Sequence, residues 1–247
     1  TRELPCNVLT YGLEHDADYT AADITWDKYG HPSFSVLFRG KKIGSYYLRV
    51  PGIHNVSNAL AAIAVGRLLD LPDDVIVKGL GSFTGTDRRF QYKGEIGGIT
   101  IIDDYAHHPT EISALLDAAR RRYPQSVIRV IFQPHLFSRT RFFSSEFAQA
   151  LAKADDVIVT GIFPAREKQE DFPDVTPATI VDEALKLEHE PAKDWIRGVE
   201  DMHTAAQMMV MRAHHGDVIF TVGAGDITQM DKVILHALEA HRWDCEG

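Results

Sequence analysis

The first fifty residues alternate apolar and polar positions over short stretches, a pattern that predicts β-strands. Two such stretches, 34–38 and 44–48, flank Gly40-Lys41-Lys42 and predict a hairpin. Beyond them, apolar residues recur at helical spacing, so we expect an amphipathic helix over 55–69. A second, shorter helix is expected after Pro72, because proline suits a first helical turn.

The pattern changes after a glycine-rich stretch at residues 79–87, which is the best candidate for a domain boundary. From there apolar, β-branched runs alternate with amphipathic stretches. They predict strands at 99–102, 127–132, 157–160 and 218–222, and helices at 109–123, 142–154, from about 177, at 199–213 and from 226 to about 241. This alternation is typical of an α/β fold, a parallel sheet with helices on both faces.

The strand expected at 99–102 is followed by the polar sequence Asp103-Asp104-Tyr105-Ala106-His107-His108-Pro109-Thr110-Glu111. Ligands of open α/β sheets bind at the carboxyl ends of the strands, so this stretch is the main candidate for a functional site. Its carboxylates and imidazoles could also hold manganese or zinc, as in a phosphoesterase or hydrolase. The remaining alternative is a loop of solvated polar residues.

Two motifs, one in the helix expected at 55–69 and one at the boundary, carry groups suited to a nucleotide. Asn55 and Asn58 lie three residues apart, so both amides can project from one side of a helix and recognise a nucleobase edge. Asn55 taken alone could equally be an N-cap. Arg88-Arg89 could bind phosphate or could be a solvated pair.

Two motifs follow later strands. In the segment 133–141, which follows the strand at 127–132, Arg139 and Arg141 could pair with a substrate carboxylate or belong to a loop with scattered charge. Gly223-Ala224-Gly225-Asp226 could hold an anion at a helix N-terminus, although a tight turn is the commoner reason for such glycines.

Composition narrows the class of partner. The 247 residues are 45% apolar and 25% charged, as in ordinary globular proteins, and a net charge of −9 lacks the basic footprint of a nucleic-acid-binding protein. No apolar run approaches the ~18 residues of a membrane span. Cys6 and Cys245 make no disulfide framework, which fits a reducing cytoplasm. The oligomeric state is left open.

Two common motifs are missing from the sequence, one that binds nucleotide phosphates and one that carries a nucleophilic serine. It contains neither a Gly-x-x-x-x-Gly-Lys-Ser/Thr phosphate loop nor a Gly-x-Ser-x-Gly nucleophile elbow. If ATP chemistry is involved, the triphosphate cradle and the ligands of Mg²⁺ are therefore expected outside this chain. We assign no metal ligand to the residues present.

Together these motifs resemble the Mur ligase family, the ATP-dependent enzymes that build the peptide of bacterial peptidoglycan. The resemblance extends over nearly the whole chain and includes Thr10-Tyr11-Gly12, Asp16-Ala17-Asp18-Tyr19, His54-Asn55, Asn58-Ala59, Arg88-Arg89-Phe90, the stretch 103–111, Gln133-Pro134-His135, Ser138-Arg139-Thr140, Ala165-Arg166-Glu167 and Gly223-Ala224-Gly225-Asp226. It implies that residues 1–88 are the end of a central ATPase domain. Residues 89–247 would form a Rossmann-like C-terminal domain that binds an amino acid, and a UDP-sugar domain and the phosphate loop would precede Thr1.

The resemblance also implies a reaction, and it is greatest to members that add L-alanine to UDP-N-acetylmuramate. ATP phosphorylates the substrate carboxylate, the amine of alanine attacks the acyl phosphate, and phosphate leaves; ATP and Mg²⁺ are the implied cofactors. A family member that attaches a whole peptide during wall recycling shares most of these motifs. A non-catalytic nucleotide-binding module is the other alternative.

On the nucleotide side, the resemblance assigns four residues. Asn55 and Asn58 match positions that line the adenine pocket. Arg89 matches an arginine that contacts the ATP phosphates, and Asp104 matches a carboxylate that accepts hydrogen bonds from the ribose hydroxyls. The stretch that contains Asp104 would then bring two substrates together.

On the amino-acid side, Tyr105, His107, His135 and Arg139 match positions around the incoming alanine. Arg139 can pair with the alanine carboxylate, and an imidazole, His107 or His135, can accept a proton from the ammonium group before attack. One position departs from the family, which usually has arginine after the histidine where this chain has Leu136. Arg141 is the candidate to compensate.

The missing phosphate loop generates a prediction for the purified 247-residue chain. Without a cradle for the triphosphate, the chain alone should release no phosphate from ATP, with or without L-alanine. A phosphate-release assay measures this directly. Alanine-dependent phosphate release by the chain alone would contradict the prediction.

Overall fold

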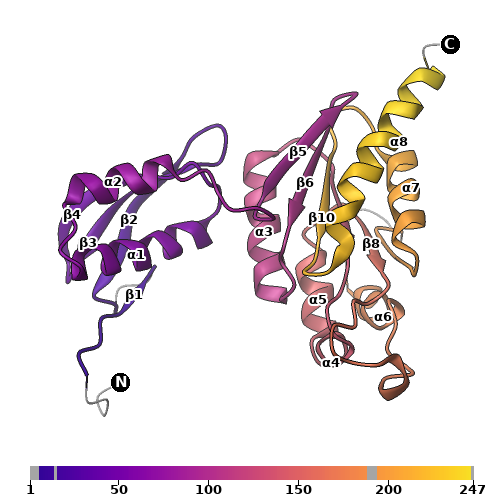
Figure 1. The fold of residues 1–247 in the computed structure, drawn as a ribbon, viewed down its shortest axis with the longest axis horizontal. Coiled ribbons are helices and arrows are strands. Elements are labelled where there is room, and N and C mark those ends of the chain that lie inside the picture. The colour runs from indigo at the N-terminus through magenta and orange to yellow at the C-terminus, as the bar shows by residue number, and fades with distance from the viewer. Residues whose placement is uncertain (1–5, 14–15, 188–193, 246–247) are drawn as a thin grey trace. The chain divides into compact units, whose positions relative to one another are not determined.

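The structure is a computed structural model that describes residues 6–13, 16–187 and 194–245, the last five of these as backbone only. The chain divides into two compact units, Thr1–Gly85 and Thr86–Gly247 (Figure 1). The division lies within the glycine-rich stretch 79–87 that the sequence pattern indicates, and it precedes the boundary after residue 88 that the family resemblance implies. Arg88 belongs to the second unit because its guanidinium donates to Asp103 and to the carbonyl of Gly223 there.

The first unit is a four-stranded sheet with two helices. Its strands lie side by side in the order β1 (Tyr11–Gly12), β2 (Tyr19–Trp26), β3 (Pro32–Phe38) and β4 (Lys41–Tyr47), followed by α1 (Ile53–Leu68) and α2 (Asp73–Ser82). The antiparallel pair β3–β4 confirms the predicted hairpin, and both predicted helices are present. The buried side of α1, with Val56, Leu60 and Ile63, joins Phe34 and Val36 of β3 in one core.

The second unit is built on a six-stranded sheet. Its order is β5 (Gln91–Ile96), β6 (Ile99–Asp104), β10 (Val218–Val222), β7 (Ile128–Phe132), β8 (Asp156–Thr160) and β9 (Ile196–Val199). All neighbouring pairs are parallel except β5–β6, which is antiparallel. The predicted parallel sheet is therefore confirmed, with two edge strands, β5 and β9, that the sequence does not predict.

Helices cover both faces of this sheet (Figure 1). They are α3 (Pro109–Arg122), α4 (Phe137–Phe142), α5 (Ser144–Leu151), α6 (Ala178–Ala184), α7 (Met202–Arg212) and α8 (Met230–Cys245), with short 3₁₀ turns η1 (Gln169–Asp171) and η2 (Asp226–Gln229). Residues of α3, α5 and α6 form the core on one face, and residues of α7 and α8 form the core on the other.

One predicted helix differs from the structure. The sequence predicts a helix over 142–154, but helical structure begins at Phe137 and is broken at Phe143 into α4 and α5. Leu136 has a left-handed backbone, with φ of 71°, which turns the chain into α4 directly after the loop that follows β7. Arg139 and Arg141 therefore lie on a helix and not in a loop.

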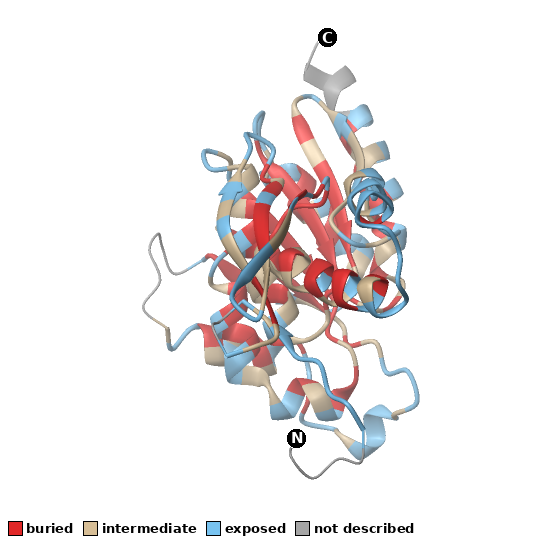
Figure 2. Cartoon of the chain, turned by 90° about the vertical axis from the view of Figure 1, so that its left-hand side faces the viewer, coloured by how far each residue is buried: buried red, intermediate tan, exposed pale blue. Residues whose placement is uncertain are grey.

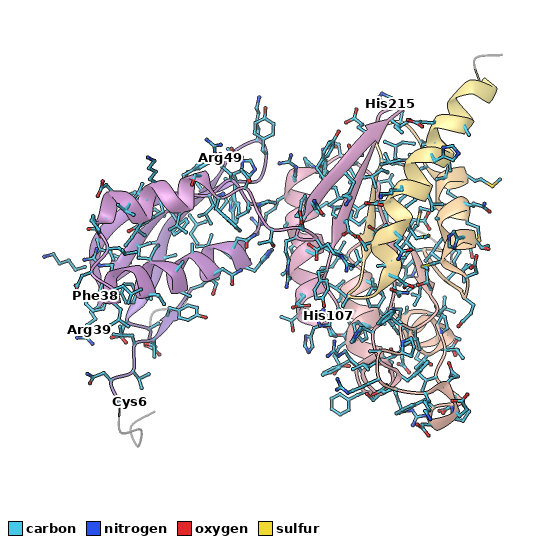
Figure 3. The ribbon with its side chains drawn as sticks, viewed as in Figure 1. Cys6, Phe38, Arg39, Arg49, His107 and His215 are labelled. Atoms are coloured by element: carbon cyan, nitrogen blue, oxygen red, sulfur yellow. The ribbon has the colours of Figure 1, made fainter. Side chains whose placement is uncertain are left out.

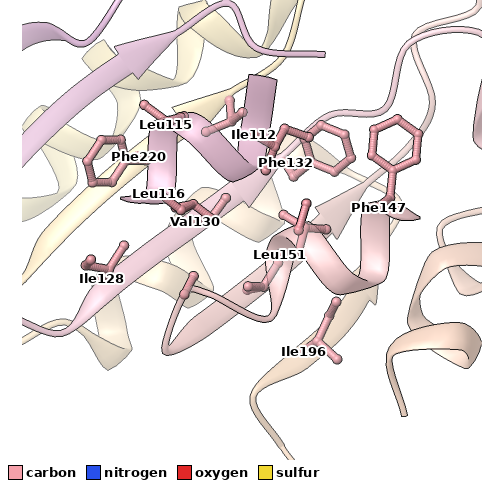
Figure 4. Close-up of a cluster of buried hydrophobic side chains, with 14 of the residues drawn as sticks. Ile112, Leu115, Leu116, Ile128, Val130, Phe132, Phe147, Leu151, Ile196 and Phe220 are labelled. Atoms are coloured by element: carbon pink, nitrogen blue, oxygen red, sulfur yellow. The ribbon is translucent and has the colours of Figure 1, made fainter. Parts of the chain in front are cut away.

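The core of the second unit follows the period of the strands. Alternate residues Val130 and Phe132 of β7 face α3 and α5, where they meet Leu116, Phe147 and Leu151 (Figure 4). The intervening Ile131 joins the core on the other face. In Figure 2 the buried residues follow the strands and the sides of the helices that face them.

Two findings bear on the expectations from composition. Among the described residues, no helix is long and apolar enough to cross a membrane. Cys6 is exposed and free, whereas the side chain of Cys245 lies outside the described residues.

The packing of α5 on the sheet predicts a stability difference between two phenylalanines. Phe147 is fully buried and Phe142 is 77% exposed. Phe147→Ala should lower the free energy of unfolding by about 3–5 kcal/mol, because it leaves a cavity against Phe132. Phe142→Ala is the matched control and should cost less than about 1 kcal/mol. Urea unfolding measures both; equal losses would contradict the packing.

Candidate active site

The carboxyl ends of β6, β10, β7 and β8 meet at one edge of the parallel sheet because these strands are neighbours. In Figure 3, His215, which precedes β10, and His107, which follows β6, lie near opposite ends of the strands of the second unit. The two segments predicted to carry the site, after β6 and after β7, therefore lie at the same edge, with only β10 between their strands.

Asp103 is a structural residue. It has no exposed surface, and its carboxylate accepts from Thr221 Oγ1 at 2.8 Å and from Thr228 Oγ1 at 2.9 Å. It also accepts from Nε of Arg88 at 3.2 Å, while the same guanidinium donates to the carbonyl of Gly223 at 2.6 Å. Asp103 thus joins the ends of β6 and β10 to the segment before β5.

Asp104 shapes the loop that it begins. Its two carboxylate oxygens accept from the amides of Phe90 and Ala106, each at 2.8 Å. The residue is 6% exposed, and burial raises its pKa to about 6, against the opposing effects of these hydrogen bonds and of nearby Arg89. Each oxygen keeps a second lone pair, which is the capacity that a ribose hydroxyl would require.

His108 and Glu111 are explained by capping of α3. Glu111 accepts from the amides of His107 at 3.0 Å and His108 at 3.3 Å, and Nδ1 of His108 accepts from the amide of Thr110 at 3.3 Å. This is a capping box with histidine at the N-cap. His108 and Glu111 therefore stabilise the start of α3. Of the two adjacent histidines, His107 and His108, only His107 is left available for chemistry.

The ring of His107 is oriented by its own loop. Nδ1 lies 3.0 Å from the carbonyl oxygen of Tyr105 and 3.4 Å from the Glu111 carboxylate. A carbonyl only accepts, so Nδ1 carries the proton, and Nε2 of the neutral ring is left as an acceptor.

An aromatic cluster joins the loops after β6, β7 and β8. The ring centroids of Tyr105 and His107 are 5.3 Å apart, those of His107 and His135 5.7 Å, and those of His135 and Phe163 5.7 Å. Burial lowers the pKa of His135, and the positive charge of Arg139 lowers it further. Both effects favour the neutral imidazole of His135.

Arg139 completes this group. It is half-buried on α4, and one guanidinium nitrogen lies 3.4 Å from the carbonyl oxygen of His107. Within the described part of the chain it makes no ion pair with a carboxylate. The structure therefore brings Tyr105, His107, His135 and Arg139 together, and it leaves the guanidinium able to pair with an anion.

Arg141, the candidate to compensate for Leu136, has contacts of its own. Its guanidinium pairs with Asp174 and lies 5.3 Å from the ring of Phe172. Leu136 itself is 6% exposed. The structure thus gives Arg141 a partner, Asp174, that lies 33 residues away in the sequence.

The nucleotide-side candidates lie in both units. Arg89 is exposed, and its guanidinium lies 5.8 Å from the ring of Tyr105 in the second unit. In the first unit, Asn58 donates to the side-chain oxygen of Asn55 at 3.3 Å, and Asn55 donates to the carbonyl of Pro51 at 2.7 Å. The N-cap of α1 is Gly52, so the N-cap interpretation of Asn55 was wrong.

The glycines after β10 are explained by close packing. A Cβ on Gly223 would lie 2.7 Å from the carbonyl oxygen of Gln133, and one on Gly225 would lie 2.3 Å from its side-chain oxygen. Gln133 donates to Asp226 at 2.7 Å and accepts from the amide of Ile227 at 3.1 Å. These contacts favour the tight-turn interpretation of the motif.

One pair of residues had no predicted role. Ser138 at the start of α4 donates from its amide and its hydroxyl to the carboxylate of Glu167, on the loop after β8. Both residues belong to motifs that carry the family resemblance, and that was the only sequence signal for them.

The metal-site interpretation finds no support in the part of the chain that the structure describes. There, no group of three or more His, Cys, Asp or Glu side chains could hold a metal ion. The physical reason is visible in the stretch 103–111, where Asp103, His108 and Glu111 are engaged in hydrogen bonds within the protein.

Comparison with known families accounts for this arrangement. Residues 88–225 match the model of the Mur ligase glutamate ligase domain, and residues 1–66 match the Mur ligase middle domain. The chain belongs to the Mur ligase family, whose members use ATP.

Within this family, the chain is similar in sequence to ligases that are named for L-alanine. Over 200 residues the chain is 82% identical to UDP-N-acetylmuramate–L-alanine ligase of Bifidobacterium adolescentis, which covers 81% of this chain and 38% of that protein. It is 42% identical over 231 residues to the enzyme of the same name from Clostridium kluyveri, covering 94% of the chain and 49% of the relative. The chain thus spans less than half the length of these two relatives.

Solved structures of two ligases share the fold of this chain. The UDP-N-acetylmuramate–alanine ligase of Thermotoga maritima superposes with a TM-score of 0.76 at 30% identity, over 94% of this chain and 48% of that one. A murein peptide ligase from Psychrobacter arcticus shares the fold, with a TM-score of 0.64 at 24% identity, over 93% of this chain and 46% of that one.

The burial of Asp104 predicts a pH-dependent stability. Its pKa is about 6 in the fold and 3.8 as a free side chain, so the fold favours the protonated carboxyl. Relative to Asp104→Asn, the wild-type chain should lose up to about 3 kcal/mol of unfolding free energy between about pH 4 and pH 8.

Two measurements check this. Urea unfolding of both proteins across that pH range gives the difference, and the carbon-13 shift of the Asp104 carboxyl gives its pKa directly. A carboxyl that titrates near its ordinary value would show that burial does not control it.

Proposed function

We propose that this chain is part of an ATP-dependent ligase that joins L-alanine to UDP-N-acetylmuramate in peptidoglycan synthesis, in the cytoplasm. UDP-N-acetylmuramate, L-alanine and ATP are the proposed substrates. The proposal rests on one observation above all: Arg139, a guanidinium with no carboxylate partner among the described residues, lies beside two imidazoles. A free amino acid needs these two kinds of group, a cation for its carboxylate and a base for its ammonium.

The chemical step divides between these residues. The guanidinium of Arg139 pairs with the alanine carboxylate in a bidentate geometry. Nε2 of His107 accepts a proton from the ammonium group, because its Nδ1 is already protonated against the Tyr105 carbonyl. The free amine then attacks the acyl phosphate, the new C–N bond forms, the C–O bond to phosphate breaks, and the departing phosphate takes up the second proton that the nitrogen loses. Catalysis is mainly positioning of the two reactants.

His135 and Tyr105 complete the proposed alanine site. Burial and Arg139 lower the pKa of His135, which favours the form of the ring that places no positive charge next to the incoming ammonium. Its ring is held by Phe163 on one side and His107 on another. Tyr105 packs edge-on against His107 and so supports the orientation of the base.

The nucleotide-side roles remain proposals of the same kind. We assign Arg89 to the ATP phosphates, Asp104 to the ribose hydroxyls, and Asn55 with Asn58 to the adenine. The exposed guanidinium of Arg89 and the hydrogen-bonded amide pair of Asn55 and Asn58 support these assignments. Mg²⁺ would accompany ATP, and no residue described here is assigned to it.

The alternative within the family is a ligase that attaches a whole peptide during wall recycling. The murein peptide ligase shares the fold alone, whereas the 82% identity to an L-alanine ligase favours alanine. A substrate panel that compares L-alanine with a peptide acceptor separates the two.

Arg139→Ala, in a full-length protein that contains this chain, tests the proposed ion pair between Arg139 and the alanine carboxylate. Loss of a charged, bidentate partner should raise the KM for L-alanine by roughly a hundredfold while the KM for ATP changes little, since the charged contact is worth about 1.5–3 kcal/mol. Alanine-dependent phosphate release measures both constants.

Arg141→Ala is the matched control, because this arginine lies on the same helix but pairs with Asp174. It should leave both KM values unchanged. Equal rises in the two KM values for Arg139→Ala, or the same effect from Arg141→Ala, would refute the assignment.

A further inference from the structure

The first turn of α4 lacks a cap of its own. Its N-cap residue is Leu136, whose side chain cannot accept a hydrogen bond. The first amides of any helix have no partner within the helix, and a polar N-cap side chain usually supplies one. For α4 the acceptor must come from elsewhere in the chain.

Glu167 supplies it from 29 residues away. Its carboxylate accepts from the amide of Ser138 at 3.0 Å and from the hydroxyl of the same serine. Desolvation acts to raise the pKa of Glu167, but the hydrogen bonds from Ser138, a backbone hydrogen bond from Phe137 and the charge of Arg166 together hold the pKa below its ordinary value. The carboxylate is therefore charged, as a helix N-terminus favours.

The loop that carries Glu167 is itself fixed to the loop before α4. The amide of Phe163 donates to the carbonyl of Pro134 at 2.8 Å, and the amide of Leu136 donates to the carbonyl of Phe163 at 2.9 Å. These bonds frame a short parallel bridge between His135 and Phe163. Glu167 thus acts from a held position and not from a free loop.

The apolar side of α4 is anchored as well. Phe137 is buried against Ile162 and Val175, and it stacks on Phe172. Between this anchor and Arg139 there is one residue, Ser138. The direction in which α4 presents Arg139 therefore depends on an apolar contact at Phe137 and a charged contact at Ser138.

We propose that Glu167 is a positioning residue: through Ser138 it aims Arg139 at the carboxylate of the incoming amino acid, and so sets the affinity for that substrate without touching it. This inference rests on the proposed function of Arg139. Both carboxylate oxygens of Glu167 accept from Ser138, and this contact connects Glu167 to the helix that carries Arg139.

Kinetics of a full-length protein that contains this chain test the inference. Glu167→Ala should raise the KM for L-alanine roughly tenfold and change the KM for ATP by no more than about twofold, because misdirecting a substrate-binding group weakens only that substrate. Glu167→Gln should have a smaller effect, since its amide oxygen can still accept from Ser138. Glu170→Ala, an exposed glutamate three positions along the chain, is the matched control and should leave both KM values unchanged.

A double-mutant cycle separates positioning from direct contact. In an Arg139→Ala background, Glu167→Ala should add no further rise in the KM for L-alanine, because the group that it aims is gone. Additive effects of the two substitutions would overturn the inference, since they would mean that Glu167 acts on the amino acid independently of Arg139.

Hydrogen exchange of the same full-length proteins, without substrates, tests the contact between Glu167 and Ser138 independently of activity. The amide of Ser138 should exchange faster in Glu167→Ala than in the wild type, and at the wild-type rate in Glu170→Ala. Unchanged exchange at Ser138 would overturn the inference even if the ligase is active. A wild-type protein without alanine-dependent phosphate release would instead overturn the proposed function, and with it the role of Arg139.

Discussion

A buried carboxylate that requires donors on every side organises the second unit. Asp103 has no contact with solvent, and a polar group in such a place is tolerated only when it is hydrogen-bonded. Thr221, Thr228 and Arg88 supply the donors from β10, from η2 and from the segment before β5. Each of them comes from a different part of the chain. One side chain at the end of β6 therefore fixes where three other segments meet it, and the proposed site is built on that junction.

The polar stretch after β6 divides its residues between structure and chemistry. Asp103 ties strands together, while His108 and Glu111 cap α3. The cap also shapes the function, because Glu111 holds the amide of His107 and lies near its ring. Much of this polar stretch thus serves folding, and it leaves His107 beside His135 of the loop after β7.

Much of the fold could be predicted because its signals are local. The strands β6, β7, β8 and β10 are apolar runs buried on both faces, and such runs are visible in any short window of sequence. The edge strands are different: β9 reads Ile-Arg-Gly-Val and β5 contains a glycine, so neither forms an apolar run. In the site, the predicted side chains around His107 do lie together. The partners of Ser138 and Arg141 lie 29 and 33 residues away, and no local pattern encodes them.

The left-handed turn at Leu136 has a consequence for how this site can diverge. Its conformation is imposed from outside the residue: its amide bonds to Phe163, and its carbonyl accepts from the amide and the hydroxyl of Thr140. The steric cost of a positive φ, of order 1–3 kcal/mol, arises at Cβ and is similar for any side chain larger than glycine. Main-chain course and side-chain identity are therefore separable at this position. A lineage can exchange a charged residue for leucine there and alter the local charge, while the helix that carries Arg139 keeps its place.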